Sequence, residues 1–142
     1  MIREARPSDE ARLRAIQTSA LDEPWPELLD VGIEGPPLVL VLDAGEPAAY
    51  ALVVPDRPVA YLAEFAVAPA MQSQGLGTAL MEGLLGRLRE TGFETVRLTA
   101  REDDERARSF YDGFGFSKAE ALPDHYDDGD GVLLVRELGR PE

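Results

Sequence analysis

The segment VAPAMQSQGLGTAL, from Val67 to Leu80, places Gly75 and Gly77 between an apolar strand-like segment and an apolar helix-like one. Glycine has no Cβ, so the backbone can approach a phosphate closely, and free N–H groups at a helix start attract anions. Glycines at such a junction can also simply let the chain turn with a positive φ. The two glycines alone therefore predict either a phosphate cradle or a turn.

Two well-defined phosphate-binding motifs do not fit this segment. The dinucleotide motif Gly-x-Gly-x-x-Gly needs a third glycine where Leu80 stands. The P-loop needs Gly-Lys-Ser/Thr, which the segment lacks. Both nucleotide-binding classes are therefore excluded at this position.

The flanking segments predict a strand, a helix and a second strand. VAYLAEFAVA is typical of a strand and is ended by Pro69. Leucines then recur about every 3.6 residues, which predicts a helix from Gly75 to about Glu90, with Gly92 as its C-terminal cap. ETVRLTA predicts the next strand, and the helical connection indicates that it lies parallel to the first.

The rest of the chain extends this pattern on both sides. The further predicted elements are a strand at IREAR, a helix after Pro7-Ser8-Asp9, a short helix from about Glu27, a hairpin PPLVLVLDAGEPAAYALVV, a helix in DDERARSFYDGFGF and a last strand at GVLLVREL. The order β-α-α-β-β-β-α-β-α-β predicts a mixed α/β fold. We expect a central mixed twisted sheet of about six to seven strands, flanked by about four helices.

Length and composition indicate a single folded domain over residues 1–142, since 44% of the residues are apolar and they are spread along the chain. Cysteine is absent, which excludes disulfides and thiolate metal sites. Because His125 is the one histidine, we expect no metal site. The charged N-terminal segment and the lack of a long apolar run predict a cytoplasmic protein that does not bind membranes.

The formal net charge is −13, from 27 acidic and 14 basic residues, and Lys118 is the one lysine. Such a charge repels nucleic acid and anionic membranes, so neither is expected as a partner. Two interpretations remain open. One is an acidic surface adapted to a salty cytoplasm, which the large acidic excess favours, and the other is a high-GC genome with a mild acidic bias.

Two motifs together resemble the GNAT family of acetyl-CoA-dependent N-acetyltransferases. The first is Gln72-x-x-Gly75-x-Gly77, at the exit of a strand and before an amphipathic helix. The second, further along the chain, is Phe110-Tyr111-x-x-x-Gly115-Phe116. The resemblance runs from about residue 2 to residue 138, and the combination is more specific than either motif. It favours the phosphate cradle over the simple turn and implies a GNAT-like fold.

The resemblance implies acetyl-CoA as co-substrate and assigns residues to it. In that family (R/Q)-x-x-G-x-(G/A) holds the coenzyme pyrophosphate through main-chain amides. The preceding strand separates from its neighbour, here after Val67, and offers main-chain groups to the pantetheine arm. Asp104 stands where the family usually has Asn near that arm, and its charge weakens the expected coenzyme affinity. The coenzyme-binding residues so implied are Ala66, Val67, Gln72, Ser73, Gln74, Gly75, Leu76, Gly77, Thr78, Asp104 and Ala107.

A finer resemblance, to the ribosomal-protein-alanine type of N-terminal acetyltransferase, concerns the acceptor. DEPWPE, from Asp22 to Glu27, resembles the Pro-Trp turn that those enzymes carry between their first two helices. HYDDGDG, residues 125–131, resembles their Tyr-Tyr-x-Asp-Gly-x-Asp segment apart from its first and last residues. This implies Trp25 and Tyr126 as acceptor-binding residues and a protein N-terminal amine as acceptor. We add Glu64, on the strand that leads to Pro69, to the expected acceptor-binding residues.

Amine acetylation requires that the amine lose a proton and that the departing thiolate gain one. Tyr111 matches the family tyrosine that protonates the coenzyme sulfur, and a phenol with a pKa near 10 can do so. The alternative interpretation is that Tyr111 is a core aromatic residue that packs beside Phe110. We assign Phe110, Phe114 and Phe116 to the core. The absence of cysteine favours direct transfer over an acyl-enzyme.

The general base is not fixed by the motifs. Leu98-Thr99-Ala100-Arg101 stands where the similar enzymes often have Leu-Glu-Val-Arg, and Thr99 cannot replace that glutamate as a base. Glu64 is the best remaining carboxylate for the role of base. The alternative interpretation is that Glu64 is a solvated strand residue with no role in catalysis. An ordered water is a second candidate base. His125 titrates in a suitable range, but a lone loop histidine is more typical of solvated surface.

The acceptor also remains open. The acidic runs at residues 102–105 and 127–130 are typical of solvated faces, but at the rim of an acceptor groove they would favour a cationic amine, either a peptide N-terminus or a polyamine. A different hypothesis, motivated by Thr99, is a module that binds acyl-CoA as a sensor without catalysis. The oligomeric state, monomer or homodimer, cannot be read from the sequence.

Overall fold

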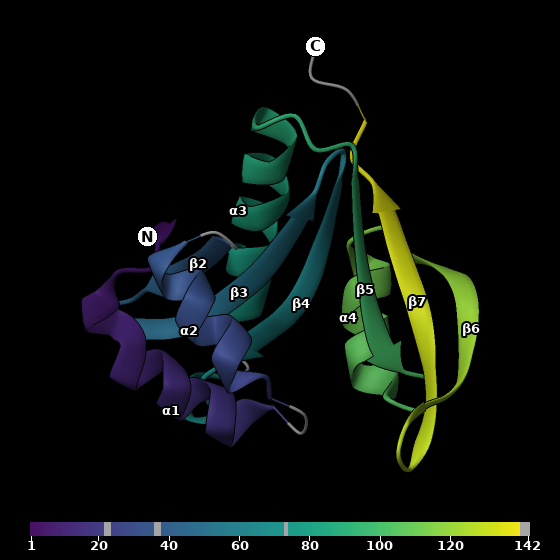
Figure 1. The fold of residues 1–142 in the computed structure, drawn as a ribbon, viewed down its shortest axis with the longest axis horizontal. Coiled ribbons are helices and arrows are strands. Elements are labelled where there is room, and N and C mark those ends of the chain that lie inside the picture. The colour runs from purple at the N-terminus through teal and green to yellow at the C-terminus, as the bar shows by residue number, and fades with distance from the viewer. Residues whose placement is uncertain (22–23, 36–37, 73, 140–142) are drawn as a thin grey trace.

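The computed structural model describes residues 1–21, 24–35, 38–72 and 74–139, and its centre is a seven-stranded sheet (Figure 1). The strands are β1 (Ile2–Glu4), β2 (Leu38–Asp43), β3 (Pro47–Asp56), β4 (Val59–Val67), β5 (Thr95–Arg101), β6 (Ser117–Tyr126) and β7 (Gly129–Glu137). The helices are α1 (Glu10–Ala20), α2 (Pro26–Glu34), α3 (Leu76–Glu90) and α4 (Glu105–Gly113), with short 3-10 turns η1 (Pro7–Asp9) and η2 (Pro69–Met71). The predicted mixed α/β fold is confirmed.

The strand order is β1-β2-β3-β4-β5-β7-β6, and β4 and β5 form the one parallel pair among the described strands. The predicted strand-helix-strand unit through α3 is thus confirmed. Its ladder has three residue pairs and ends at Tyr61 opposite Arg97, although β4 continues to Val67. The expected separation of these strands is therefore present, but it begins directly after Tyr61 and not after Val67 as we expected.

The helices cover the two faces of the sheet in pairs (Figure 1). α1 and α2 pack on one face of β2, β3 and β4, where Leu13, Ile16 and Leu29 are buried against the sheet. α3 packs on the opposite face through Leu80 and Leu84, as its leucine spacing predicts. Side chains of α4 join the α3 cluster, so α4 shares its face.

One residue in β4 changes which side chains face which helix layer. The register between β3 and β4 shifts at Ala63, which has no opposite residue, as in a β-bulge. Before the bulge Leu62 faces α3, whereas after it Ala66 belongs to the cluster under α1 and α2. The bulge thereby turns Glu64 toward the α1 and α2 face, where the side chain is 6% exposed.

Our sequence pattern had one strand after α4, and this is wrong, because β6 precedes β7 as an antiparallel edge strand. β6 is almost wholly exposed and contains Lys118, Glu120 and Pro123, the residues with which proteins protect sheet edges from pairing. Such a strand lacks the apolar alternation that identifies buried strands. His125, which we placed in a loop, lies at the end of this strand and is exposed, with its ring against Tyr126.

Among the described residues, no helix combines the length and the apolar character needed to cross a bilayer.

Candidate active site

The separation of β4 and β5 after Tyr61 leaves space for two adjoining pockets. The α3/α4 pocket, of about 440 Å³, lies between the exit of β4, the first turn of α3 and one face of α4. The β4/β5 pocket, of about 310 Å³, lies between the two diverging strands. Residues common to both linings are Ala20, Phe65, Asp104, Ala107 and Tyr111. A molecule that occupies one pocket would thus end where a molecule in the other begins.

The two predicted glycines shape one wall of the α3/α4 pocket. Gly75 has φ +78 and directly precedes α3, so it makes the left-handed turn that glycine allows. The N-cap Gly75 has no side chain that could cap this helix, and the first N–H groups of a helix lack intrahelical partners, so those of α3 are available in the pocket lining. A Cβ on Gly77 would lie 3.6 Å from Phe110 and from Val67. The turn and the anion-binding cradle are therefore the same feature.

Most residues that the resemblance assigned to the coenzyme line the α3/α4 pocket. They are Ala66, Val67, Gln72, Gly75, Leu76, Gly77, Thr78, Asp104 and Ala107. Ser73 lies outside the described residues, and Gln74 is exposed and does not line the pocket. The Gln72 side-chain amide donates to the carbonyl of Val67 at 3.2 Å and so connects the loop to the end of β4.

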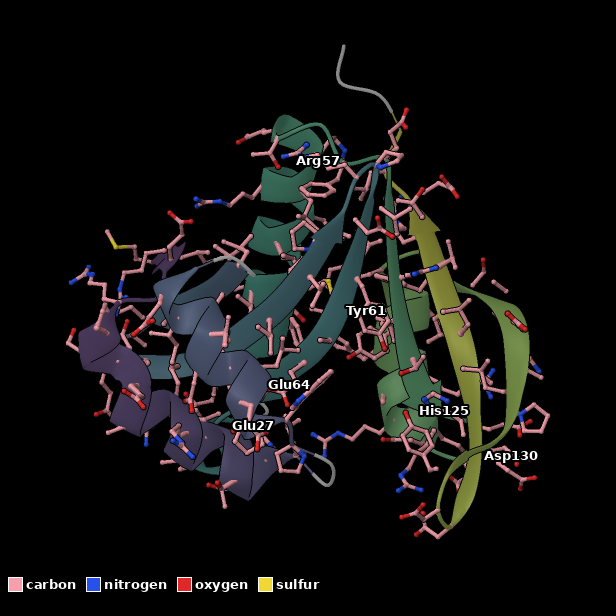
Figure 2. All side chains as sticks on the ribbon, viewed as in Figure 1. Glu27, Arg57, Tyr61, Glu64, His125 and Asp130 are labelled. Atoms are coloured by element: carbon pink, nitrogen blue, oxygen red, sulfur yellow. The ribbon has the colours of Figure 1, made fainter. Side chains whose placement is uncertain are left out.

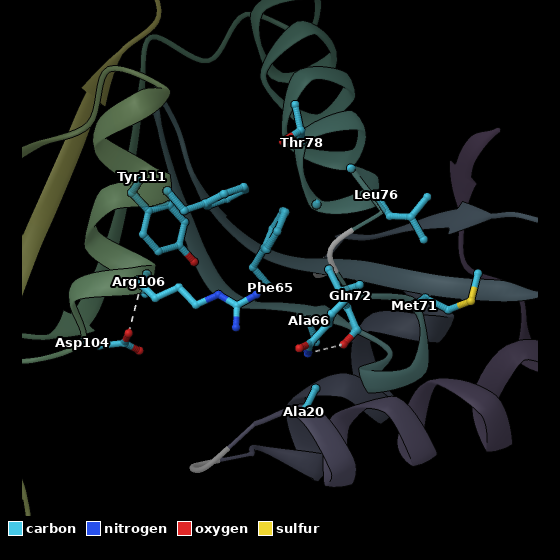
Figure 3. Close-up of a pocket in the computed structure, with 15 residues that line it drawn as sticks. Ala20, Phe65, Ala66, Met71, Gln72, Leu76, Thr78, Asp104, Arg106 and Tyr111 are labelled. Atoms are coloured by element: carbon cyan, nitrogen blue, oxygen red, sulfur yellow. Dashed lines mark hydrogen bonds between the residues drawn. The ribbon is translucent and has the colours of Figure 1, made fainter.

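α4 provides the facing wall of the same pocket (Figure 3). Asp104 precedes the helix and accepts a hydrogen bond from the Ala107 N–H at 3.0 Å, an N-cap that explains a carboxylate at this position. Arg106 extends from the first turn across the pocket, as Figure 3 shows. Tyr111 lies one turn after Ala107, where the two pockets meet.

The phenol of Tyr111 is in an environment that keeps it protonated. Its ring packs edge-on against Phe110, at 5.4 Å between centroids, and against Phe116, at 5.6 Å. Desolvation by this burial raises the pKa of Tyr111 above its usual range, and the negative charge of Asp104 adds to the effect. The phenol therefore stays in its protonated form at neutral pH, as a proton donor must.

The end of β5 and the β6–β7 hairpin form one side of the β4/β5 pocket. Arg101 donates to Asp128 at 2.7 Å, and its guanidinium lies 4.5 Å from the centre of the Tyr126 ring. The hydrogen bond from Arg101 holds the pKa of Asp128 below its usual range. Both Arg101 and Tyr126 line the pocket, so this ion pair fixes the hairpin beside it.

Thr99, where the resemblance led us to look for a glutamate, also lines the β4/β5 pocket. Its hydroxyl lies 3.3 Å from the Tyr61 hydroxyl, within hydrogen-bond distance. Tyr61 points into the gap between β4 and β5 from the last paired position of β4 (Figure 2). The pair leaves a neutral polar contact at this position and no carboxylate.

Glu64 lines the β4/β5 pocket, and its carboxylate is bound by groups from α1, β3 and the start of α2 (Figure 2). Its carboxylate accepts hydrogen bonds from the side chains of Gln17 and Tyr50 and from the backbone N–H of Trp25. Burial and the adjacent Glu64 charge raise the pKa of Tyr50 above its usual range, so Tyr50 remains a neutral donor. Glu64 is thus not the solvated strand residue of our alternative interpretation.

The acceptor residues suggested by the resemblance are only partly brought together. Tyr126 and Glu64 line the β4/β5 pocket. Trp25 does not, and its side chain is 57% exposed, although its backbone is bound to Glu64. Asp22 and Glu23 of the same motif lie outside the described residues.

Sequence reasoning missed several lining residues. Phe110, which we assigned to the core, is only partly buried and lines the α3/α4 pocket, with its ring 5.6 Å from Phe65. Arg106 was not singled out, although its spacing of four from Phe110 places the two on one helical face. That spacing is the signal that could have identified both. Phe116 is buried, as we predicted, and Phe114 packs at the edge of the core.

Residues 4–116 match the acetyltransferase (GNAT) family. The chain belongs to this family. It is 36% identical over 87 residues to the [ribosomal protein bS18]-alanine N-acetyltransferase of Escherichia coli K12, a match over 61% of this chain and 59% of that relative's length. The corresponding protein of Salmonella typhimurium is 33% identical over 110 residues, which are 76% of this chain and 74% of the relative.

The fold comparison agrees with the sequence comparison. The crystal structure of the ribosomal-protein-S18-alanine N-acetyltransferase from Escherichia coli matches with a TM-score of 0.89 and 28% identity, over 100% of this chain and 96% of that one. The GNAT-like fold and the finer resemblance to the ribosomal-protein-alanine type are both confirmed.

Proposed function

We propose that this GNAT member transfers the acetyl group of acetyl-CoA directly to the α-amine of a protein N-terminus. The observation that carries the proposal is the meeting of the two pockets at Tyr111. One pocket suits the donor and the other the acceptor, and a phenol stands at the junction. The names of the bacterial relatives support a protein N-terminus as acceptor.

The α3/α4 pocket fits a phosphorylated, partly apolar donor such as acetyl-CoA. The N–H groups at the start of α3 can bind a pyrophosphate, with the positive end of the helix dipole behind them. Arg106 adds a cation to the same pocket. Phe65, Val67 and Phe110 supply apolar surface along the end of β4, against which a pantetheine arm can pack.

The chemistry requires one bond to form and one to break. The acceptor nitrogen attacks the thioester carbonyl carbon, the new C–N bond replaces the C–S bond, and the leaving thiolate takes the proton of Tyr111. The amine gives its proton to water in the β4/β5 pocket, from which Tyr111 is protonated again. Proximity in adjoining pockets supplies much of the rate, and Tyr111 as general acid contributes roughly 10²–10⁴-fold.

The acidic runs support a peptide acceptor more than a polyamine. Asp104 caps α4, Asp128 pairs with Arg101, and the Asp130 side chain accepts the backbone N–H of Asp124 at 2.8 Å. These three carboxylates thus have structural partners. Because these partners already engage the three carboxylates, the carboxylates are less available to a polyamine, which needs several negative charges.

Thiol release from acetyl-CoA tests the proposal directly. We expect release with a peptide that begins with free alanine and little with the same peptide acetylated at its N-terminus, with spermidine or with an N-blocked lysine peptide. Turnover on spermidine but not on the peptide would replace the proposal by small-amine acetylation. Acetyl-CoA binding without turnover on any of these amines would favour the sensor hypothesis that Thr99 motivated.

A further inference from the structure

The carboxylate of Glu64 connects three elements that are distant in the sequence. Gln17 on α1 donates its side-chain amide to Oε1 at 2.9 Å and to Oε2 at 3.2 Å. Tyr50 on β3 donates its hydroxyl to Oε1 at 2.9 Å. The backbone N–H of Trp25, directly before α2, donates to Oε2 at 2.8 Å. Gln17, Tyr50 and Glu64 are all buried, so these bonds are shielded from water.

These contacts leave Glu64 little capacity to take a proton from an amine. A carboxylate offers about four lone-pair directions, and four donor contacts already converge on Glu64. A general base needs a lone pair aimed at the proton that it removes. Its donors come from the α1 and α2 side of the sheet, so the carboxylate is directed toward them and not toward Tyr111.

The carboxylate holds the end of α1 and the start of α2 beside the β4/β5 pocket. Ala20 and Leu21, at the end of α1, line this pocket, and Trp25 follows before α2 begins. Trp25 is the N-cap residue of α2, and its N–H bond to Glu64 connects this helix start to β4. The buried charge-assisted bonds are of the kind that holds a backbone in one position.

We propose that Glu64 is a positioning residue that holds the end of α1 and the start of α2 at the acceptor-side wall, and that it is not the general base. This inference rests on the acetyl transfer proposed above. It assigns Gln17 and Tyr50, buried polar residues that the transfer chemistry does not use, as the supports of that carboxylate.

Glu64→Gln tests the inference, because it keeps the shape of the side chain but turns one acceptor oxygen into an NH₂ group that faces N–H donors. We expect the KM for the alanine peptide to rise about tenfold, since a wall displaced by about 1 Å misplaces the acceptor. The KM for acetyl-CoA and the pH dependence of kcat should remain unchanged. A kcat lowered about 10²-fold or more with an unchanged peptide KM and an altered pH profile would overturn the inference and restore Glu64 as base.

Tyr50→Phe provides a second variant that leaves the carboxylate in place. It removes one donor from Glu64, so it should raise the peptide KM in the same direction by a smaller factor. Thr95→Val is the control, because it also removes one hydroxyl hydrogen bond, to Glu137, and Thr95 is in the lining of neither pocket. Equal peptide KM values in Tyr50→Phe and wild type, in a folded protein, would contradict the inference.

Trp25 gives a readout that does not depend on acetyl transfer, because it is the one tryptophan of the sequence. Released from Glu64, Trp25 should move more freely, so Glu64→Gln should lower the steady-state fluorescence anisotropy of Trp25 and speed exchange of its amide hydrogen. An unchanged anisotropy and exchange rate would overturn the inference. If wild type acetylates no peptide while these signals still change, the acetyl transfer fails and the anchoring of Trp25 by Glu64 stands.

Discussion

The Asp104 carboxylate accepts the Ala107 N–H at 3.0 Å, and both residues line the α3/α4 pocket. The sequence resemblance presented Asp104 as a departure from asparagine that adds an unfavourable charge near the coenzyme. The structure shows a second role, since the residue begins the helix that carries Tyr111. Its charge also contributes to the raised pKa of Tyr111.

Two substitutions at this position separate the cap from the charge. Asp104→Ala removes the cap and should lower the free energy of unfolding by about 1 kcal/mol, measured by urea denaturation. Asp104→Asn keeps a capping oxygen, so stability should remain within a few tenths of a kcal/mol of wild type, while the KM for acetyl-CoA falls because a negative charge leaves the pocket. An acetyl-CoA KM that rises in Asp104→Asn would show that the charge assists donor binding.

Tyr111→Phe tests the proton donor. The variant keeps the ring that packs against Phe110 and Phe116, so the fold and acetyl-CoA binding should be nearly unchanged. We expect kcat to fall by about 10²-fold or more, because the thiolate must then leave unprotonated or take a proton from water. Steady-state kinetics, with acetyl-CoA binding followed by calorimetry, gives both quantities. Turnover equal to wild type would remove Tyr111 from its role.

The pH dependence of wild type follows from the same phenol. Burial raises the pKa of Tyr111, so the protonated form that donates persists beyond the usual tyrosine pKa of about 10. We therefore expect no decrease of kcat on the alkaline side up to about pH 10. A decrease centred near pH 8 or 9 that disappears in Tyr111→Phe would mean that the phenol ionises in the working range.

The order of elements from β1 to α4 could be predicted because each of them has a clear signal. The leucines of α3 recur at helical spacing, and turn residues delimit the β2–β3 hairpin. β6 could not be predicted, since an edge strand is in contact with water on most sides and its residues are selected to prevent pairing. The β4 bulge at Ala63 was equally invisible, because one inserted residue leaves the apolar composition unchanged.

For the site, the sequence identified residues that motifs fix and missed those that tertiary structure brings in. Gly75, Gly77 and Tyr111 belong to motifs, and the structure places all three on the α3/α4 pocket. The partners of Glu64 could not be inferred, because Gln17 is 47 positions away and nothing in its own segment points to a carboxylate. The identification of Glu64 as a candidate depended on elimination, which finds the residue but not its role.

Arg106 should contribute to the binding of phosphorylated donors. Arg106→Ala removes a cation that extends into the α3/α4 pocket, and a charge-assisted bond to phosphate of roughly 1.5 kcal/mol corresponds to about a tenfold higher KM for acetyl-CoA. With S-acetylpantetheine, which lacks the pyrophosphate, the variant should match wild type. Arg108→Ala is the control, because Arg108 is on the same helix but lines a different groove. Equal losses with both donors would show that Arg106 acts by packing.

Salt should stabilise the protein. With a net charge of −13, exposed carboxylates repel one another in the folded state, and the screening distance falls from about 10 Å at 0.1 M salt to about 3 Å at 1 M. Salt also weakens exposed ion pairs such as Arg14 with Asp30, but single surface pairs contribute only about 0–1 kcal/mol. The thermal midpoint should therefore rise between 0.1 and 2 M KCl, as salt adaptation requires. A midpoint independent of KCl would favour genome composition as the origin of the acidity.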